Sequence, residues 1–172
     1  MGRGGAMTLR QRLAGARGAA GASGWALVPL RLLVGYGFAA HGYAKLARGP
    51  AAFAEILSAI GIPGALPTAW ITSLLELVGG VSIMLGAAVL PLAVPFVAVM
   101  LTALVGVHAR YGFSSVRLKS VSAAGAVFGP VGYEVNLLYI AALIALALER
   151  PTPLSVDRWI ENRGRRRQIA GD

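Results

Sequence analysis

Long apolar stretches alternate with short polar segments along most of the chain. Four of the stretches come close to the ~20 residues that an α-helix needs to cross a ~30 Å hydrocarbon core. They cover residues 25–46, 66–90, 92–109 and 131–149. The pattern predicts an all-α integral membrane protein, a four-helix bundle in which every helix spans the bilayer.

The composition agrees with a membrane protein. Hydrophobic residues make up 56% of the 172 residues and charged residues 13%, whereas a soluble domain carries roughly 25% charged residues. Cysteine is absent, which excludes disulfides, Cys-x-x-Cys redox chemistry and thiolate metal sites within this chain. A redox role would therefore need a quinone, a borrowed cofactor or a partner subunit.

The distribution of basic residues predicts the topology. Ten basic residues lie in the two terminal segments and five in the loops on the other side, so the positive-inside rule places both termini in the cytoplasm. Because the net charge of +9 is concentrated beside membrane spans, we expect contact with anionic lipid rather than with nucleic acid. The ten are Arg3, Arg10, Arg12, Arg17, Arg150, Arg158, Arg163, Arg165, Arg166 and Arg167.

Three segments follow from this topology. Residues 1–24 are expected to form a disordered basic cytoplasmic tail, because they are rich in Gly, Ala and Arg without apolar periodicity. Residues 25–149 form the membrane domain. Residues 150–172 form a basic cytoplasmic tail with a short interfacial helix that Ser155 can cap.

The connections between the spans carry local signals. Phe53, Leu57 and Ile60 have helical spacing, which predicts a short amphipathic helix at the outer interface. Pro91 and Pro95 are expected to bracket a tight turn between the second and third spans. Small residues in the first three spans should let the helices approach closely. They are Gly35 and Ala39, Gly79 and Gly80, and Ala98, Thr102 and Gly106.

Each span contains an ionisable residue, which is costly at bilayer depth and so indicates a candidate site. Counting 1.5 Å per residue from each span's midpoint places four of these residues in one layer of the outer half. They are His41, Glu76, His108 and Glu134. Lys45 and Tyr133 lie above this layer, and Arg31 lies on the cytoplasmic side.

We interpret Glu76 and His41 as a central proton-accepting pair that His108 and Glu134 complete or gate. Arg31, Lys45 and Tyr133 are the candidate cofactor-binding residues. Alternatively, Glu76 only fixes the helix register, and Arg31 extends to the interface. Haem is disfavoured by the two carboxylates in the layer, and a metal site by the missing Glu-x-x-His spacing.

The order of these motifs resembles the DoxX family of small four-span membrane proteins. The resemblance covers about residues 25–160. The matching pieces are Arg31-Leu-Leu-Val-Gly35, His41-Gly42 with Lys45, Glu76 with Gly79-Gly80, His108-Ala-Arg-Tyr-Gly112, Gly132-Tyr133-Glu134 and the closing Leu154-Ser155-Val156-Asp157.

The resemblance implies a subunit or accessory of a quinone-linked membrane redox complex, an oxidoreductase component without a cofactor motif of its own. Quinone is the expected small molecule, and the expected location is the bacterial inner membrane, crossed several times. Two alternatives stay open at this point. The chain is a non-catalytic assembly or structural subunit of a larger membrane complex, or it transports a small solute as an oligomer.

Overall fold

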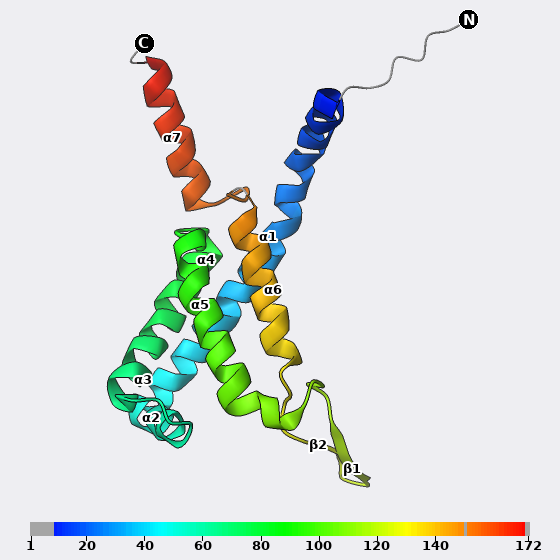
Figure 1. Cartoon of the computed structure of the whole chain (residues 1–172), viewed down its shortest axis with the longest axis vertical. Coiled ribbons are helices and arrows are strands. Elements are labelled where there is room, and N and C mark those ends of the chain that lie inside the picture. Colours follow the sequence, from blue (N-terminus) through cyan, green and yellow to red (C-terminus); the bar gives the residue numbers. More distant parts are fainter. Residues whose placement is uncertain (1–8, 150, 171–172) are drawn as a thin grey trace, which may run out of the picture.

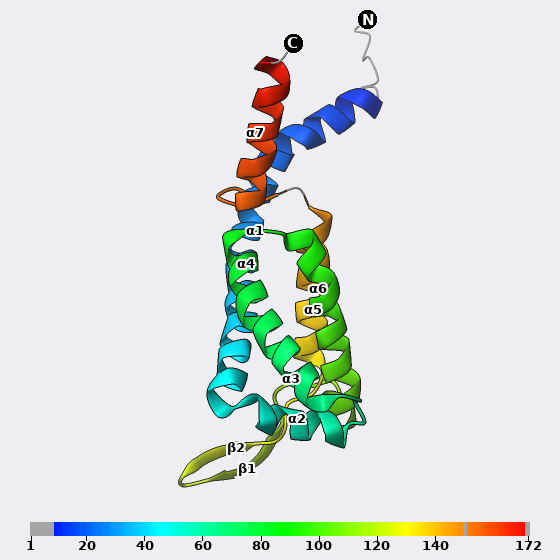
Figure 2. The same cartoon turned by 90° about the vertical axis from the view of Figure 1, so that its left-hand side faces the viewer.

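The computed structural model describes residues 9–149 and 151–170, and most of them are helical. Four helical segments lie side by side in both views of the molecule (Figures 1 and 2). They are α1 (Leu9–Arg48), the run α3 (Ala65–Leu74), η1 (Leu75–Gly79) and α4 (Gly80–Leu85), the run α5 (Val89–Ala103), η2 (Leu104–His108) and η3 (Ala109–Tyr111), and α6 (Glu134–Leu148).

Two of these segments are long and apolar enough to cross a membrane. They are Ala65–Leu85, of 21 residues, and Val89–Tyr111, of 23 residues. They correspond to the second and third predicted spans. The first predicted span lies within α1, and the fourth coincides with the shorter apolar helix α6.

The remaining elements sit at the ends of the four segments (Figures 1 and 2). Helix α2 (Pro50–Ala59) packs on α3 near one end, and the strands β1 (Leu118–Ser122) and β2 (Gly125–Phe128) project beyond that end. Helix α7 (Val156–Ala170) extends from the other end. The predicted amphipathic helix and the predicted C-terminal helix are therefore both present as helices.

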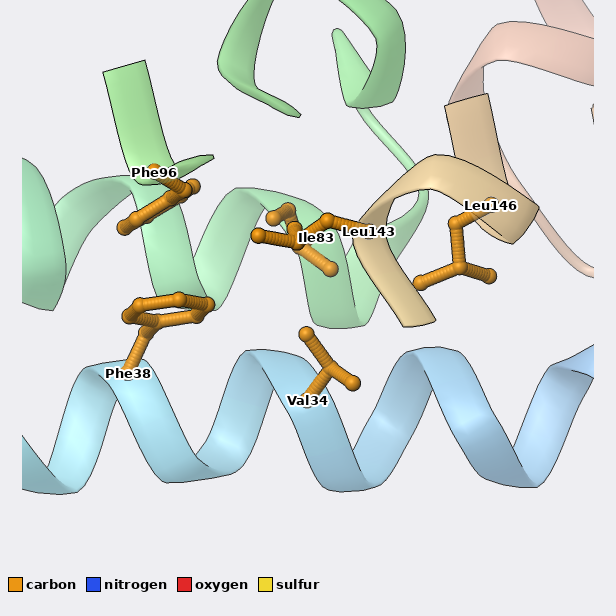
Figure 3. Packing of buried hydrophobic residues seen from close by; sticks show 6 residues of the cluster. All are labelled: Val34, Phe38, Ile83, Phe96, Leu143 and Leu146. Carbon is orange, nitrogen blue, oxygen red and sulfur yellow. The ribbon is translucent and has the colours of Figure 1, made fainter. Parts of the chain in front are cut away.

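One apolar core joins the four segments (Figure 3). The Phe38 ring of α1 stacks on the Phe96 ring of α5, with 4.0 Å between the centroids, and the Tyr139 ring of α6 meets Phe38 edge-on at 5.3 Å. Such aromatic pairs add about 0.5–1.5 kcal/mol beyond the area they bury. The buried members of this core are Val34, Phe38, Ile83, Phe96, Leu143 and Leu146.

Glycines allow α1 to contact the second helical run backbone to backbone. A Cβ at Gly80 would lie 2.5 Å from the Ala39 nitrogen, and one at Gly42 would lie 2.3 Å from the Leu77 nitrogen. The close approach predicted at Gly35 and Ala39 is confirmed, because Gly35 is equally close to the Gly80 carbonyl.

Two helical runs contain a π-helical turn. Glu76 lies in η1, and His108 is the last residue of η2. Each π turn inserts an extra residue into an α-helix, which rotates the following side chains, and such turns often mark functional positions. The apolar pattern of the sequence gave no indication of either turn.

The turn between the second and third helical runs differs from the prediction. It is formed by Gly86 and Ala88 in left-handed conformation, with φ of 66° and 53°, and α5 begins at Val89. Pro91 and Pro95 therefore lie inside α5 and do not bracket the turn. Pro91 is tolerated because it lies in the first helical turn, where the N–H that it lacks has no helical partner. Pro95 lies in the helix interior and removes one hydrogen bond of α5.

Two further regions depart from the expected architecture. Helix α1 extends back to Leu9, where we expected no regular structure; Ala, Leu, Arg and Gln are good helix formers. Residues 1–8 of that tail and Arg150 lie outside the described residues. The hairpin of β1 and β2 departs from an all-α fold, because apolar residues such as Leu118 and Val127 flank a tight turn at Gly125.

Candidate functional site

Glu76 is the most buried charged residue among the described residues, and it forms an ion pair that joins η1 to α1. Lys45 Nζ lies 2.6 Å from both Glu76 carboxylate oxygens. The Glu76 side chain is 2% exposed and that of Lys45 is 22% exposed. The ammonium also lies 4.3 Å from the centre of the Phe53 ring of α2, a cation–π contact. The carboxylate is thus enclosed by charge-assisted hydrogen bonds rather than open to a cleft.

Local packing explains why Lys45 reaches Glu76. Gly42 lets the α1 backbone touch η1, next to the Leu77 nitrogen and the Ser73 carbonyl. Lys45 follows Gly42 by three residues, so both lie on the same face of α1. The side chain of Lys45 therefore starts beside the π turn that carries Glu76.

His41 does not pair with Glu76, contrary to our prediction. Its side chain is exposed, although the adjacent Gly42 is buried against η1. Counting residues along a helix fixes height, but each residue also turns the side chain by about 100°. His41 and Lys45 are neighbours one turn apart on α1, and it is Lys45 that reaches the carboxylate while His41 stays exposed.

His108 and Glu134 fix the segment around the hairpin instead of joining the pair. His108 Nδ1 donates to the Val131 carbonyl at 2.9 Å, and the Ser115 amide donates to Glu134 Oε2 at 3.0 Å. Among the described residues, no hydrogen bond or ion pair connects either side chain to Glu76. Of the predicted layer, Glu76 therefore belongs to the ion pair, whereas His108 and Glu134 hold the loop around the hairpin. We call the contacts of His108 and Glu134 the loop anchor.

Tyr133 belongs to the same loop anchor. Its amide donates to the Gly112 carbonyl at 3.0 Å, and its ring meets that of Phe113 edge-on at 5.7 Å. A Cβ at Gly132 would lie 2.2 Å from the Gly112 carbonyl, so the segments around Gly112 and Gly132 are in direct backbone contact. These contacts give the Gly132-Tyr133-Glu134 motif a structural role in holding the loop.

Arg31 lies deep at the opposite end of the helical segments. Its side chain donates to the Thr152 hydroxyl, to the Pro153 carbonyl at 3.4 Å and to the Leu154 carbonyl at 3.0 Å. The residue is only 3% exposed, because the segment that follows α6 covers its guanidinium. It ties the segment after α6 back to α1.

Asp157 makes a second tie at this end, which sequence reasoning missed. Its two carboxylate oxygens accept hydrogen bonds from the amides of Ala88 and Val89, at 2.9 and 3.2 Å, and so cap α5 from another part of the chain. Ser155 caps its own helix as predicted, since the Arg158 amide donates to its hydroxyl at 3.2 Å. We call Arg31, Thr152, Leu154 and Asp157 the C-terminal clasp.

Sequence reasoning also passed over Asn136. This residue is 5% exposed in α6, and its amide nitrogen donates to the Met100 carbonyl of α5 at 3.4 Å. A polar residue in the first turn of an apolar helix was the available signal. Within residues 9–149 and 151–170, no group of three or more His, Cys, Asp or Glu side chains could hold a metal ion.

Comparison with known proteins identifies the family of the membrane domain. The family model described as DoxX matches residues 26–109, from the start of the first predicted span to the residue after His108. Glu134 and the Asp157 motif lie beyond the matched range. No curated protein and no solved structure matches the chain. Over residues 26–109, the sequence therefore matches the DoxX family model, the family that its motifs resemble.

Proposed function

We propose that this DoxX-family protein is a four-span subunit or accessory of a larger, quinone-linked redox complex in a bacterial inner membrane. Support for the four spans comes from the two long apolar helices and from the core that α1 and α6 share with them. The basic residues of both termini support a cytoplasmic location for the two ends. The quinone link follows from the family resemblance.

The observation that carries the proposal is the outward face of α1. His41 is exposed in the outer half of the first span, and Tyr36 is 62% exposed nearer its middle. An ionisable or hydroxyl-bearing side chain that faces lipid at bilayer depth is costly, so such groups normally face protein, water or a ligand. A partner subunit packed against the His41 side of α1 would cover the imidazole.

The Lys45–Glu76 pair supports this arrangement because it fixes the position of α1 against η1. Because the pair joins α1 to η1, it holds the rotation of α1 that turns His41 outward. His41 is then the titratable group offered to the shared interface, where a quinone headgroup could accept or donate a proton. Glu76 has a positioning role in this scheme.

The test is substitution of His41 by leucine in the full chain, expressed in its native membrane. We expect His41→Leu to keep the thermal stability of the isolated protein, since the side chain has no partner among the described residues. Stoichiometric partners should be lost on purification in mild detergent, together with quinone reduction by the membranes. Mass spectrometry and a quinone-reduction assay provide the two measurements.

The matched control is Glu55→Gln, which alters an exposed ionisable residue on α2. It should retain partners and activity. If His41→Leu also retains both, the outward face of α1 is not the docking surface and the proposal fails.

A non-catalytic structural subunit is the second candidate, and the closed geometry of the Lys45–Glu76 pair favours it. A carboxylate enclosed by an ammonium at 2.6 Å leaves no open face for a ligand. In that case His41→Gln, which keeps a hydrogen-bonding side chain but cannot titrate, should preserve both partners and activity. Loss of activity with partners retained would favour the redox role.

A further inference from the structure

A groove opens beside the C-terminal clasp, between α1, α4 and the first turn of α7. Its volume is about 520 Å³, within the range of small-molecule sites. Most of its surface is contributed by apolar side chains, which suit an alkyl chain rather than a polar ligand. The main apolar residues lining it are Val28, Leu32, Met84, Leu85, Val156 and Trp159.

Arg31 contributes a buried positive charge to this groove. All its hydrogen bonds go to uncharged oxygens, and no carboxylate of the described residues lies within 4 Å of it. Its Nε atom is buried without any partner among those residues. Asp157 acts on Arg31 only through space, because its oxygens are engaged by Ala88 and Val89. A buried cation of this kind favours an anion nearby.

The mouth of the groove carries a second positive charge. Trp159 is 54% exposed there, and the Arg163 guanidinium lies 3.7 Å from the centre of its ring. Tryptophan and arginine together are typical of the level of lipid headgroups. With the topology proposed above, this mouth lies at the cytoplasmic leaflet, where anionic lipids attract basic segments.

We propose that this groove binds one anionic phospholipid. An acyl chain lies along Leu32, Met84 and Leu85, and the phosphate lies at the end occupied by Arg31, Trp159 and Arg163. The site is distinct from the outward face of α1, and it needs no partner subunit. The bound lipid would stabilise the clasp by supplying the counter-charge that Arg31 lacks.

The experiment uses the full chain with Trp25→Phe and Trp70→Phe, so that Trp159 is the only tryptophan. The protein is reconstituted in phosphatidylcholine vesicles that contain a small fraction of phosphatidylglycerol brominated on its acyl chains. We expect quenching of Trp159 to saturate at a low fraction of this lipid. Brominated phosphatidylcholine at the same fraction should quench about fivefold less, the factor expected for one arginine near an anionic headgroup.

Two variants test the two halves of the site. Arg31→Gln should abolish the preference for phosphatidylglycerol, whereas Arg48→Gln, at the other end of α1, should keep it. Leu32→Phe should fill the groove and reduce quenching without touching the contacts of Arg31. Leu33→Phe is its matched control, because Leu33 is 67% exposed and does not line the groove.

Three outcomes would overturn the proposal. The first is equal quenching by the two brominated lipids, and the second is unchanged quenching in Leu32→Phe. The third is displacement of phosphatidylglycerol by glycerol phosphate alone, which would show an anion site without a lipid chain. Because the measurement needs only the purified chain, its failure leaves the His41 docking test unaffected.

Discussion

Helix α1 carries a cation near each end of its predicted membrane segment, Arg31 buried and Lys45 partly buried, and the two are held in different ways. Lys45 meets a carboxylate on the neighbouring helical run, with 2.6 Å to each oxygen. Arg31 meets a hydroxyl and two carbonyls from residues that follow α6, more than 100 positions along the chain. The charge of Lys45 is therefore neutralised by a carboxylate, whereas the charge of Arg31 is not.

The difference shows how each end contributes to the protein. The Lys45–Glu76 pair locks two adjacent helices and has no charge left to attract a ligand. The Arg31 end fixes a distant segment and still presents a positive charge to a groove. We therefore expect substitutions at the first end to affect mainly stability, and those at the second to affect both stability and lipid binding.

Breaking the ion pair should have the largest effect. Glu76→Leu leaves the Lys45 ammonium partly buried without its counter-ion, and we expect a loss of about 3–5 kcal/mol in the free energy of unfolding. Chemical unfolding in mixed micelles measures this change. The double variant Lys45→Met with Glu76→Leu should recover most of the loss. If the double variant is no better than the single one, burial of an uncompensated charge is not the cause.

Removing the guanidinium at the opposite end should cost less. Arg31→Met keeps the length of the side chain but loses its charge-assisted hydrogen bonds, for which we expect about 1.5–3 kcal/mol. The clasp should open, so trypsin should cut at Arg158 faster than in the parent chain. Arg48→Met, which removes an exposed charge from the same helix, should leave the cleavage rate unchanged. Equal protection of Arg158 in both variants would contradict the clasp.

The close helix contact below the ion pair can be tested without changing any charge. A methyl group at Gly42 would lie 2.3 Å from the Leu77 nitrogen, so Gly42→Ala should separate α1 from η1 at a cost of about 1–3 kcal/mol. Gly61→Ala is unsuitable as a control because its φ is 80°. Ala40→Leu, which adds bulk on the exposed face of α1 without lowering helix propensity, is preferable. A Gly42→Ala protein of unchanged stability would mean that the contact is looser than described.

The helix cap in the clasp should have the smallest effect. Asp157→Ala removes the acceptor for two amides at the start of α5, and we expect about 1 kcal/mol. Thermal unfolding of the purified chain is the measurement. Asp157→Asn retains one acceptor oxygen and should fall between the parent and the alanine variant. If Asp157→Ala matches the loss in Arg31→Met, the two ties act as one unit.

Much of the architecture could be predicted from the pattern of residues. The two long apolar helices coincide with the second and third predicted spans, and the helix after Ser155 begins where its cap indicated. The close approach at Gly35 and Ala39 was also foreseen. These features depend on composition and spacing within one segment, so local physics was sufficient.

The candidate site could be predicted only in part. The sequence identified Glu76, Lys45 and Arg31 as unusual residues at bilayer depth, but it paired Glu76 with His41. Counting depth placed Lys45 above Glu76, yet the long side chain of Lys45 starts beside the contact of Gly42 with η1 and reaches the carboxylate. The β1–β2 hairpin and the two π turns were missed because neither changes the apolar pattern.

The sequence by itself determined which segments are apolar, where the basic residues lie and which few polar groups those segments contain. Tertiary structure alone decided that Lys45 faces Glu76, that His41 faces outward and that Asp157 caps α5. The physical reason is that hydropathy and helix propensity are properties of a local stretch. The partner of a side chain depends instead on helix rotation and on contacts between segments far apart in the chain.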